Sequence, residues 1–322
     1  MIQLLKVTKT YGQRQAVAGL SLDIGPGEFV VLIGPSGSGK STTLRLINRL
    51  VEFDTGSVRF AGQDIRSFAP EALRRRMGYA IQSVGLFPHW TVEKNIATVP
   101  RLLGWPAART AARVHELLEL LQLDPAQFAR RYPHELSGGQ QQRVGVARAL
   151  AADSEVLLMD EPFGALDPVT RVTLQQELKR IHTLSGKTIV LVTHDIDEAL
   201  YLGGRIVLFR EGRVVQDGSP LALLTRPADG FVSDFLGRSE LGLKRLGLGT
   251  VADRLRPGEP AGGDPVRSDA NLREALSAFF VQGRESLPVV DAQGRPAGAL
   301  HLVDLLAAHP ASPPAAAAGE GA

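Results

Sequence analysis

The chain has 322 residues, of which 44% are hydrophobic and 22% are charged, and its formal net charge is +2. The length predicts about two domains, and the composition is that of an ordinary globular protein with a sizeable core. So small a charge gives no reason to expect nucleic acid as a partner, and the lack of cysteine excludes disulfides and thiolate metal sites. The first residues lack a signal-peptide layout, and no apolar stretch approaches the roughly 20 residues that span a bilayer. Any work at a membrane therefore needs another chain as the anchor.

The N-terminal part of the chain presents short strands and then a glycine-rich loop. Residues 2–33 have the pattern of strands with turns at Gly12 and Gly25–Gly27. The last of these strands, Phe29–Ile33, is apolar and β-branched, as buried strands are. Gly34–Ser41 then fits the pattern G-x-x-x-x-G-K-[ST], and Thr42–Leu50 has helical spacing.

This order of strand, glycine loop and helix favours a phosphate-binding loop. Glycine lets the backbone approach a phosphate closely, and a helix N-terminus attracts anions. In this motif Lys40 reaches the β- and γ-phosphates and the Ser41 hydroxyl ligates Mg²⁺. The alternative is a Gly/Ser turn with a chance lysine, which the matching strand and helix disfavour. Tyr11 lies in the first turn region, where a lone tyrosine is usually packing, although a ring near a nucleotide stacks on a base.

A helical block interrupts the alternating α/β pattern after a hairpin over 56–68 and a strand over 77–82. The helical spacing runs from Thr91 to about Leu150 and is clearest over 111–123. We therefore predict an inserted helical subdomain over about 88–155. Within it, Leu136–Gln140 places small residues before a helix that begins near Gln141, which is a second helix N-terminus suited to an anion.

Two later strands end in residues that could carry chemistry. The strand Val156–Met159 is followed directly by Asp160 and Glu161. Acids at the end of a strand in an α/β sheet lie where ligands bind. Asp160 would hold Mg²⁺, directly or through water, and Glu161 would orient or deprotonate an attacking water; the alternative is a helix N-cap followed by a turn. The strand that begins at Thr188 ends in His194. A lone histidine is more often structural, but this one ends a strand as Asp160 does.

Together these motifs resemble those of ABC transporter ATPases over residues 2 to about 237. The motifs that occur in the family's order are Gly34–Ser41, Gln82, Leu136–Gln140, Val156–Glu161, Ala165–Asp167 and His194. The residues around them, in Ile81–His89, Tyr132–Glu135 and Met159–Asp167, are similar to the ATPases of glycine betaine/carnitine/choline osmoprotectant importers. Gly164 departs from the serine that many relatives carry, and we do not expect this to abolish activity.

The resemblance implies an α/β fold, the P-loop ABC ATPase, over 1–237, with a RecA-like core, an antiparallel β subdomain and the inserted helical subdomain. It also implies a head-to-tail homodimer that holds ATP and Mg²⁺ between its subunits. The residues implied to bind the nucleotide are Tyr11, Gly34, Pro35, Ser36, Gly37, Ser38, Gly39, Lys40, Ser41, Thr42, Ser137, Gly138, Gly139, Gln140 and Asp167.

The resemblance further implies a role for each part of this site. Tyr11 would stack on adenine, Ser137 and Gly139 would cap the ATP of the partner chain, and Asp167 would cross the dimer interface. The implied metal residues are Ser41, Gln82 and Asp160, and the implied catalytic residues are Lys40, Gln82, Glu161 and His194. Gln82 would sense the metal and the attacking water, and His194 would contact the γ-phosphate. The reaction would be in-line attack of water on the γ-phosphorus.

The last eighty residues predict a small α/β region after a linker at 238–250. The region 251–308 has helical spacing over 272–281 and strands over 287–291 and 297–300. Ser286–Asp291 followed by Gly298–Asp304 resembles one CBS repeat, with His301 where relatives that bind adenosyl ligands usually carry Thr or Ser, and Asp304 where a ribose contact would be. A docking or dimerisation domain and a sensor both remain open. The Ala/Pro/Gly-rich residues 309–322 are expected to be disordered.

The sequence thus predicts the ATPase subunit of an ABC importer of a quaternary ammonium osmolyte. It would work as a peripheral homodimer at the cytoplasmic face of the membrane, bound to membrane-spanning permease subunits and served indirectly by a substrate-binding protein. Import of another solute, such as an amino acid or a polyamine, is an alternative. A non-transport ABC ATPase that acts on DNA or ribosomes would be expected to have two fused cassettes or a long coiled coil, and a regulatory metabolite-binding protein would not need Glu161.

Overall fold

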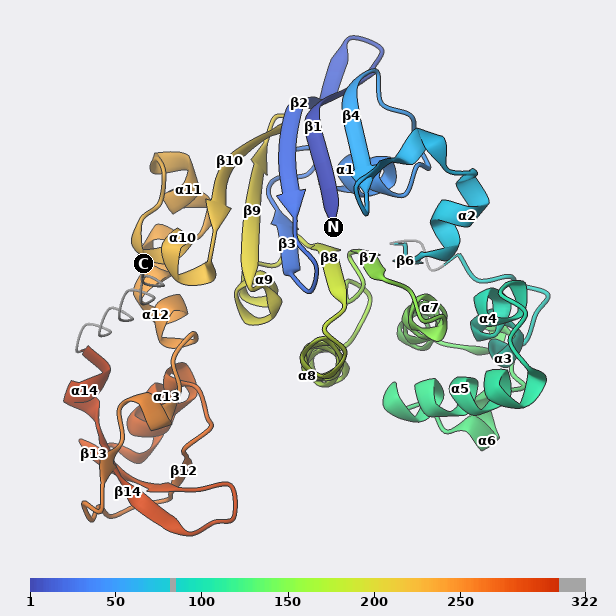
Figure 1. Ribbon diagram of the computed structural model, residues 1–322. Coiled ribbons are helices and arrows are strands. Elements are labelled where there is room, and N and C mark those ends of the chain that lie inside the picture. The colour runs from blue at the N-terminus through green and yellow to red at the C-terminus, as the bar shows by residue number, and fades with distance from the viewer. Residues whose placement is uncertain (82–84, 307–322) are drawn as a thin grey trace, which may run out of the picture. The chain divides into compact units, whose positions relative to one another are not determined.

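The computed structural model describes residues 1–81 and 85–306. The chain divides into two compact units, Met1–Arg238 and the residues from Ser239 onward (Figure 1). Gln82, for which the sequence predicts catalytic and metal-binding roles, lies outside the described residues. In the described ranges, no helix combines the length and the apolar character that crossing a bilayer requires.

The first unit is built on a six-stranded sheet in the order β10-β9-β3-β8-β7-β6. Neighbouring strands are parallel except for β10, which pairs antiparallel with β9 at one edge. The central strands β3, β7 and β8 are buried along their whole length and consist mostly of Val, Ile and Leu, as covered parallel strands do. The strands are β3 (Phe29–Ile33), β6 (Met77–Ala80), β7 (Val156–Asp160), β8 (Thr188–Val192), β9 (Arg205–Arg210) and β10 (Arg213–Gly218).

The register of the central strands brings their carboxyl ends to one edge of the sheet. Asp160 pairs with Val192 across β7 and β8, and Val192 pairs with Leu32 of β3. The three segments that follow these strands therefore leave the sheet side by side. This edge is where parallel α/β sheets bind ligands.

A second, antiparallel sheet in the order β2-β1-β4-β5 completes the β part of the first unit. Its inward side chains, such as Leu4, Leu22 and Phe60, belong to the same buried cluster as Leu32 and Leu158 of the parallel sheet. The two sheets therefore share one hydrophobic core. The strands are β1 (Ile2–Tyr11), β2 (Arg14–Ile24), β4 (Thr55–Phe60) and β5 (Gln63–Asp64).

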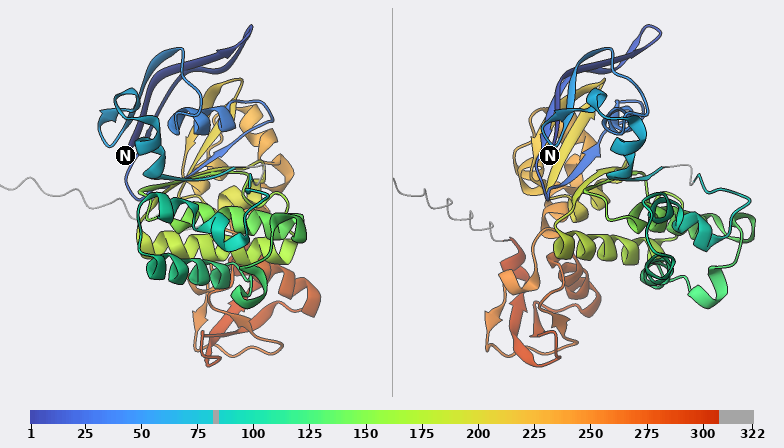
Figure 2. Two further views of the ribbon diagram at one scale, coloured as in Figure 1. Left: turned by 90° about the vertical axis from the view of Figure 1, so that its right-hand side faces the viewer. Right: turned by 45° about the vertical axis from the view of Figure 1, so that its right-hand side comes forward.

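The helices of the first unit fall into two groups. One group gathers around α7 (Figure 2), and α7 itself also packs against β6 of the parallel sheet. The group comprises α3 (Val92–Ile96), α4 (Thr98–Leu102), α5 (Ala107–Leu120), α6 (Pro125–Phe128) and α7 (Gly138–Ala151). These helices fall within the range 88–155 expected for the helical subdomain. The others are α1 (Lys40–Ile47), α2 (Pro70–Arg75), α8 (Pro168–Ser185), α9 (Ile196–Leu202), α10 (Pro220–Thr225) and α11 (Gly230–Phe235), with 3₁₀ turns η1 (Ile65–Ser67) and η2 (Pro133–Glu135).

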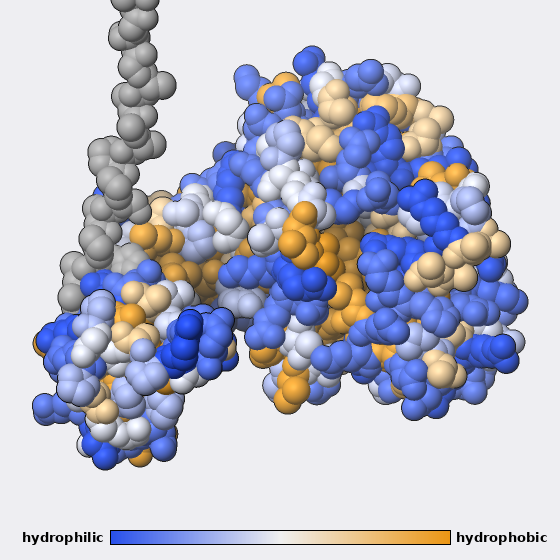
Figure 3. All heavy atoms as spheres, turned by 60° about the horizontal axis from the view of Figure 1, so that its bottom comes forward, coloured by the Kyte–Doolittle hydropathy of each residue, from blue (hydrophilic) through white to orange (hydrophobic). Residues whose placement is uncertain are grey.

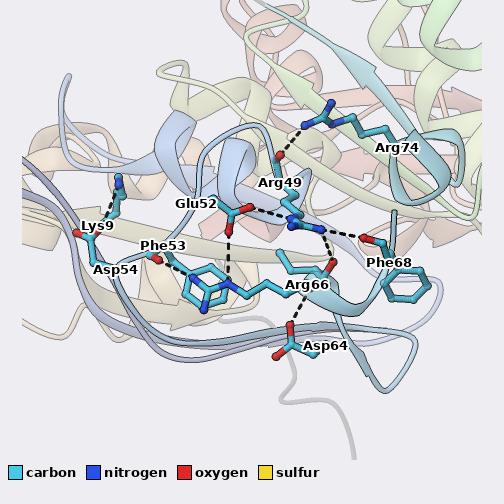
Figure 4. A network of polar contacts seen from close by, with 10 residues as sticks. Lys9, Arg49, Glu52, Phe53, Asp54, Asp64, Arg66, Phe68 and Arg74 are labelled. Atoms are coloured by element: carbon cyan, nitrogen blue, oxygen red, sulfur yellow. Dashed lines mark hydrogen bonds and ion pairs between the residues drawn. The ribbon is translucent and has the colours of Figure 1, made fainter. Parts of the chain in front are cut away.

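A polar network fixes the loop that follows α1 (Figure 4). Glu52 accepts from Arg49 Nε at 2.8 Å and from Arg66 Nε at 3.3 Å, and the Arg66 guanidinium lies 3.7 Å from the Phe53 ring centroid. The hydrogen bond from Arg49 holds the pKa of Glu52 below its usual value. Because these groups are partly exposed, the pairs orient the loop more than they stabilise the fold.

The second unit is a four-stranded sheet in the order β11-β14-β13-β12, packed against α13. Phe279 of α13 and the strand residues Leu287, Val289 and Leu300 are all buried in its small core. In Figure 3 hydrophilic residues cover most of the face of this unit, at the left of the view. The elements are β11 (Arg256–Pro257), β12 (Val266–Arg267), α13 (Leu272–Gln282), β13 (Ser286–Val290), β14 (Pro296–His301) and α14 (Leu302–Leu306), after η4 (Val251–Asp253).

Residues 238–250, predicted as a linker, are largely helical, and those from Ser239 onward belong to the second unit. They form η3 (Arg238–Glu240) and α12 (Leu241–Leu246). Leu246 packs against the core of the second unit, and the Leu272 N–H donates to the Gly249 carbonyl at 3.0 Å. The glycine content suggested a linker, but Leu246 and the largely buried Lys244 side chain give this segment a packed face.

Candidate functional site

The loop after β3 takes a conformation that requires glycine. Gly34 has φ = 140° and Gly39 has φ = 107°, in the region that favours residues without a Cβ. A Cβ at Gly34 would collide with the Phe209 carbonyl oxygen, and one at Gly39 with the Ala16 carbonyl oxygen. The loop is therefore packed against neighbouring backbone on both sides, which fixes the start of α1.

Lys40 is buried and its side chain folds back over this loop. Its Nζ donates to the Gly34 carbonyl at 2.7 Å and to the Pro35 carbonyl at 2.9 Å. Burial lowers the pKa of Lys40, and the carboxylates of Glu161 and Asp160 act in the opposite direction. The ammonium is thus held inside the ring of the loop, where a phosphate oxygen could replace the two carbonyls.

Ser41 and Asp160 form a pair of oxygen donors next to the lysine. The Ser41 hydroxyl donates to Asp160 Oδ1 at 2.8 Å, and Asp160 is only 1% exposed. Burial raises the pKa of Asp160, which a bound cation would reverse. Within residues 1–81 and 85–306 no group of three or more His, Asp or Glu could hold a metal. The pair fits Mg²⁺, which is usually bound by one or two carboxylates with phosphate oxygens and water.

Glu161 and His194 meet at the same edge of the sheet. Glu161 Oε1 lies 3.3 Å from His194 Nδ1, and the Glu161 N–H donates to the Val192 carbonyl at 2.9 Å. The φ of Glu161 is 49°, a region that few residues with side chains adopt and that recurs at functional sites. Because of this turn, the side chains of Asp160 and Glu161 point in different directions. One of the two consecutive acids can therefore bind a metal while the other acts on water.

Gln142, which no sequence motif predicts as a site residue, braces the turn after β7. Its Nε2 donates to the Glu161 carbonyl at 3.0 Å, and its Oε1 accepts from the Ala165 N–H at 2.9 Å. Gln142 lies in the first half of α7 and is 5% exposed. It therefore links the helical subdomain to the acidic turn. No local pattern marks it, because its partners lie about twenty residues away.

The N-terminus of α7 is the second candidate anion site. Ser137 Oγ accepts from the Gln140 N–H at 3.3 Å, and Gln140 Oε1 accepts from the Ser137 N–H at 3.0 Å, which is a capping box. A Cβ at Gly138 would meet nothing within 4 Å, and one at Gly139 would meet Ala165 and Leu166 only at ordinary contact distance. This end of the helix is therefore open.

Asp167 begins α8 as its N-cap. Its Oδ1 accepts from the Thr170 N–H at 3.0 Å, and hydrogen bonds from Thr170 lower the pKa of Asp167. Asp167 directly follows Leu166, which lies beside Gly139. The structure thus places Asp167 near the open end of α7 and gives it a local partner.

A pocket of about 300 Å³ lies beside the glycine loop. Tyr11 is 48% exposed at this pocket. Arg14, which no sequence motif predicts as a site residue, donates to the Gly37 carbonyl at 2.6 Å. The residues that line it are Tyr11, Arg14, Ala16, Gly37, Gly39, Lys40, Ser41 and Thr42. Ser137–Gln140 do not line it, so the structure does not bring the two candidate anion sites into one pocket.

A glycine loop at the end of β3, an acidic pair at the end of β7 and an inserted helical subdomain define an ATP-binding cassette. A family model described as ABC transporter matches residues 17–164. The chain is 61% identical over 306 residues to the glycine betaine uptake system ATP-binding protein YehX of Escherichia coli (strain K12), covering 95% of this chain and 99% of that protein. This chain belongs to the ATP-binding proteins of ABC transporters.

Two further similarities agree with this assignment. The glycine betaine/carnitine/choline transport ATP-binding protein OpuCA of Bacillus subtilis (strain 168) is 47% identical over 91% of this chain and 76% of its own length. A solved dimeric structure of a post-hydrolysis state of the ATP-binding cassette MJ0796, bound to ADP and Pi, is 36% identical with a TM-score of 0.64. The match covers 68% of this chain and 99% of the chain in the solved structure. The expected ABC ATPase fold is confirmed for this part of the chain.

Proposed function

We propose that two copies of this chain hydrolyse ATP at two shared sites and so drive uptake of a quaternary ammonium osmolyte such as glycine betaine, carnitine or choline. The main support for the proposal is that the two candidate anion-binding helix N-termini do not share a pocket within one chain. The pocket beside Gly34–Ser41 includes none of Ser137–Gln140, whereas both segments present helix N-termini suited to phosphate. A head-to-tail pair would complete each pocket with the open α7 end of the other chain, and Asp167 would lie at the interface.

Nucleotide binding would use the pocket as follows. The half-exposed ring of Tyr11 would stack on adenine, and the backbone of Gly34–Thr42 would surround the phosphates. Lys40 would exchange its two carbonyl partners for β- and γ-phosphate oxygens. Ser137, Gly138, Gly139 and Gln140 of the other chain would close over the γ-phosphate.

Hydrolysis would use the acidic turn. Ser41 and Asp160 would hold Mg²⁺, which, when bound, neutralises phosphate charge and helps to align the reacting oxygens. Glu161 would orient the attacking water and accept its proton, while His194, 3.3 Å from Glu161, would contact the γ-phosphate. Gln82 would sense the metal and the attacking water. A positioned base of this kind contributes about 10²–10⁴ in rate.

The partner surface we propose is an apolar groove of about 400 Å³ between the parallel sheet and the helical subdomain. Phe87 lines this groove and is fixed by Asn95, whose Oδ1 accepts from the Phe87 N–H at 2.8 Å. Arg148 of α7 donates to the Gly85 carbonyl at 2.8 Å and holds the start of the same segment. Apolar lining residues include Leu50, Met77, Phe87, Val99, Ala149 and Ala152. A cytoplasmic helix of a permease subunit would fill this groove and keep the chain at the inner face of the membrane.

The second unit, which resembles one CBS repeat, would serve docking or regulation and not adenosyl binding. Asp304, at the place of a ribose contact, accepts from Arg256 Nε and Nη2 at 2.9 Å each. His301 Nε2 lies 3.0 Å from Glu259 Oε1. Because both side chains already have partners within the unit, a nucleoside would have to break these contacts to bind.

The decisive experiment measures solute uptake. The chain is reconstituted with candidate permease and binding proteins into vesicles that enclose ATP. We expect uptake of glycine betaine, choline or carnitine that is lost with Lys40→Ala. Sulfate is the control solute, because a sulfate/thiosulfate import ATP-binding protein of Xylella fastidiosa (strain 9a5c) is 45% identical over 240 residues. Uptake of sulfate, an amino acid or a polyamine in place of the osmolytes would contradict the proposed solute, and hydrolysis without any uptake would contradict the transport role.

A further inference from the structure

Behind His194 lies a buried carboxyl group with no role in the site described above. Glu198, in the first turn of α9, is 6% exposed. Its Oε2 accepts from the Thr193 hydroxyl at 3.0 Å, while its buried Oε1 has no hydrogen-bond partner among the described residues. Burial of a carboxyl group with only one oxygen satisfied is costly, so this position calls for an explanation.

The contacts of Glu198 enclose His194 on both sides. Thr193, which precedes the histidine, is 2% exposed and its N–H donates to the Leu32 carbonyl at 3.2 Å. Its hydroxyl donates to Glu198 and accepts from the Asp195 N–H at 3.0 Å. Asp195, which follows the histidine, accepts from the Glu198 N–H at 3.1 Å through Oδ1. The turn that carries His194 is thus closed by a ring of hydrogen bonds that passes through Glu198.

We propose that Glu198 is a positioning residue, which fixes Thr193 and Asp195 and thereby holds the imidazole of His194 beside Glu161. This inference rests on the role proposed above for His194. Glu198 does not line the pocket beside the glycine loop, and its hydrogen bonds go to Thr193 and Asp195. It acts on hydrolysis only through the geometry of the turn.

The charges around Glu198 decide its protonation state. Burial raises the pKa of Glu198 to about 8, against the hydrogen bond from Thr193. Asp195 at the start of α9 and Glu161 after β7 also raise this pKa, and Arg171 of α8 lowers it. Glu198 is therefore neutral near pH 7, and it ionises as the pH rises through about 8. The ionised form places an unpaired charge in the turn, which loosens the position of His194.

The same shift fixes the sign of the effect on stability. The folded state binds the Glu198 proton more tightly than the unfolded state, where the pKa is near the usual 4.5. The contribution of Glu198 to the free energy of unfolding therefore falls as the pH rises from about 4.5 to about 8, and it is constant above that range. Glu198→Gln keeps the shape and the acceptor for Thr193 but cannot ionise. Its melting temperature should exceed that of the wild type by a margin that grows from pH 5 to pH 8.

The test uses the full-length chain and compares Glu198→Gln, Glu198→Ala and His194→Ala with the exposed neighbour Asp197→Asn as the matched control. At pH 7 we expect Glu198→Ala to lower kcat by about tenfold with little change in KM, because the catalytic geometry is misplaced. Glu198→Gln and Asp197→Asn should stay near the wild type. Above pH 8 the kcat of the wild type should fall, and that of Glu198→Gln should not.

Combination with His194→Ala separates positioning from general destabilisation. If Glu198 acts through His194, Glu198→Ala should cause no further loss of kcat in the His194→Ala background. An additive loss, or identical pH profiles for the wild type and Glu198→Gln, would overturn the inference. Wild-type turnover by His194→Ala would instead overturn the role proposed for His194. If Glu198→Ala does not fold, the two pH profiles and the melting temperatures still decide the question.

Discussion

Each of the two units contains a buried or half-buried aspartate, and the pKa values of the two carboxyl groups are shifted in opposite directions. In the first unit burial raises the pKa of Asp160, and its nearest polar partner is the neutral Ser41 hydroxyl. In the second unit a bidentate hydrogen bond from Arg256 lowers the pKa of Asp304. The charges of Arg45 and Lys40 offset the effect of burial on Asp160 only in part, whereas Asp304 forms an ion pair with Arg256.

This difference supports the proposal that Asp160 binds an external cation, whereas Asp304 belongs to an ion pair within its own unit. A buried acid with a raised pKa that lines a ligand edge is characteristic of a functional site. A partly exposed acid with its own arginine is characteristic of structural ion pairs, which contribute little to stability. We therefore expect substitutions in the first unit to change chemistry and those in the second unit to leave it intact.

The largest expected effect is that of Glu161→Gln. The variant should bind ATP normally, and its turnover should fall by about 10²–10⁴ because the water loses its base. It should also accumulate as a dimer with ATP, since the γ-phosphates are no longer removed. Steady-state hydrolysis and size-exclusion chromatography with ATP measure both effects. Glu211→Gln, at a highly exposed acid, is the control, and near-normal turnover in Glu161→Gln would refute the assigned role.

The second prediction tests whether the site is shared between chains. Ser137→Arg and Lys40→Ala should each abolish hydrolysis alone, and mixing the two should restore it. A head-to-tail heterodimer has one intact pocket, formed by Lys40 of one chain and Ser137 of the other. Random pairing then restores roughly a quarter of the wild-type sites. A mixture that stays inactive although heterodimers form would contradict the shared site.

The third prediction concerns the apolar groove. Val99→Asp places a charge where we propose that the permease helix docks, so uptake in vesicles should be lost while hydrolysis by the isolated chain persists. Leu102→Asp, on the same helix α4 but 59% exposed and outside the groove lining, should leave uptake unchanged. Equal uptake by the two variants would argue against docking at this groove.

Local patterns in the sequence were enough to predict most elements, because strands and glycine loops are specified by neighbouring residues. The observed ends of some elements differ from the predicted ends where capping residues determine where a helix begins. Helix α7 begins at Gly138 and not near Gln141, since Ser137 and Gln140 cap each other. Strand β8 ends at Val192, so His194 lies in the following turn.

Other features could not be predicted, because they depend on tertiary contacts. Gln142 and Glu198 resemble ordinary helix residues in the sequence. Only the fold brings Gln142 to Glu161, and only the surrounding packing buries Glu198 beside its near neighbour Thr193. The helix α12 was missed for the related reason that its packed face exists only against the second unit. The phosphate loop was predictable because its chemistry is local, from Gly34 to Ser41.

The smallest expected effect is that of Asp304→Asn, which tests the other half of the comparison. The pair with Arg256 is partly exposed, with 46% and 23% of the two side chains accessible, so its loss should cost less than about 1 kcal/mol of unfolding free energy. Because the pKa of Asp304 is lowered on folding, the pair stabilises above the usual value of 3.8 and its contribution is lost as the pH falls below it. Urea unfolding should therefore show a small difference between variant and wild type at pH 7 that is smaller at pH 3, with Asp269→Asn as a control in a more exposed pair. ATP hydrolysis at pH 7 should be unchanged, and a large loss of hydrolysis in Asp304→Asn would show that the second unit takes part in the chemistry after all.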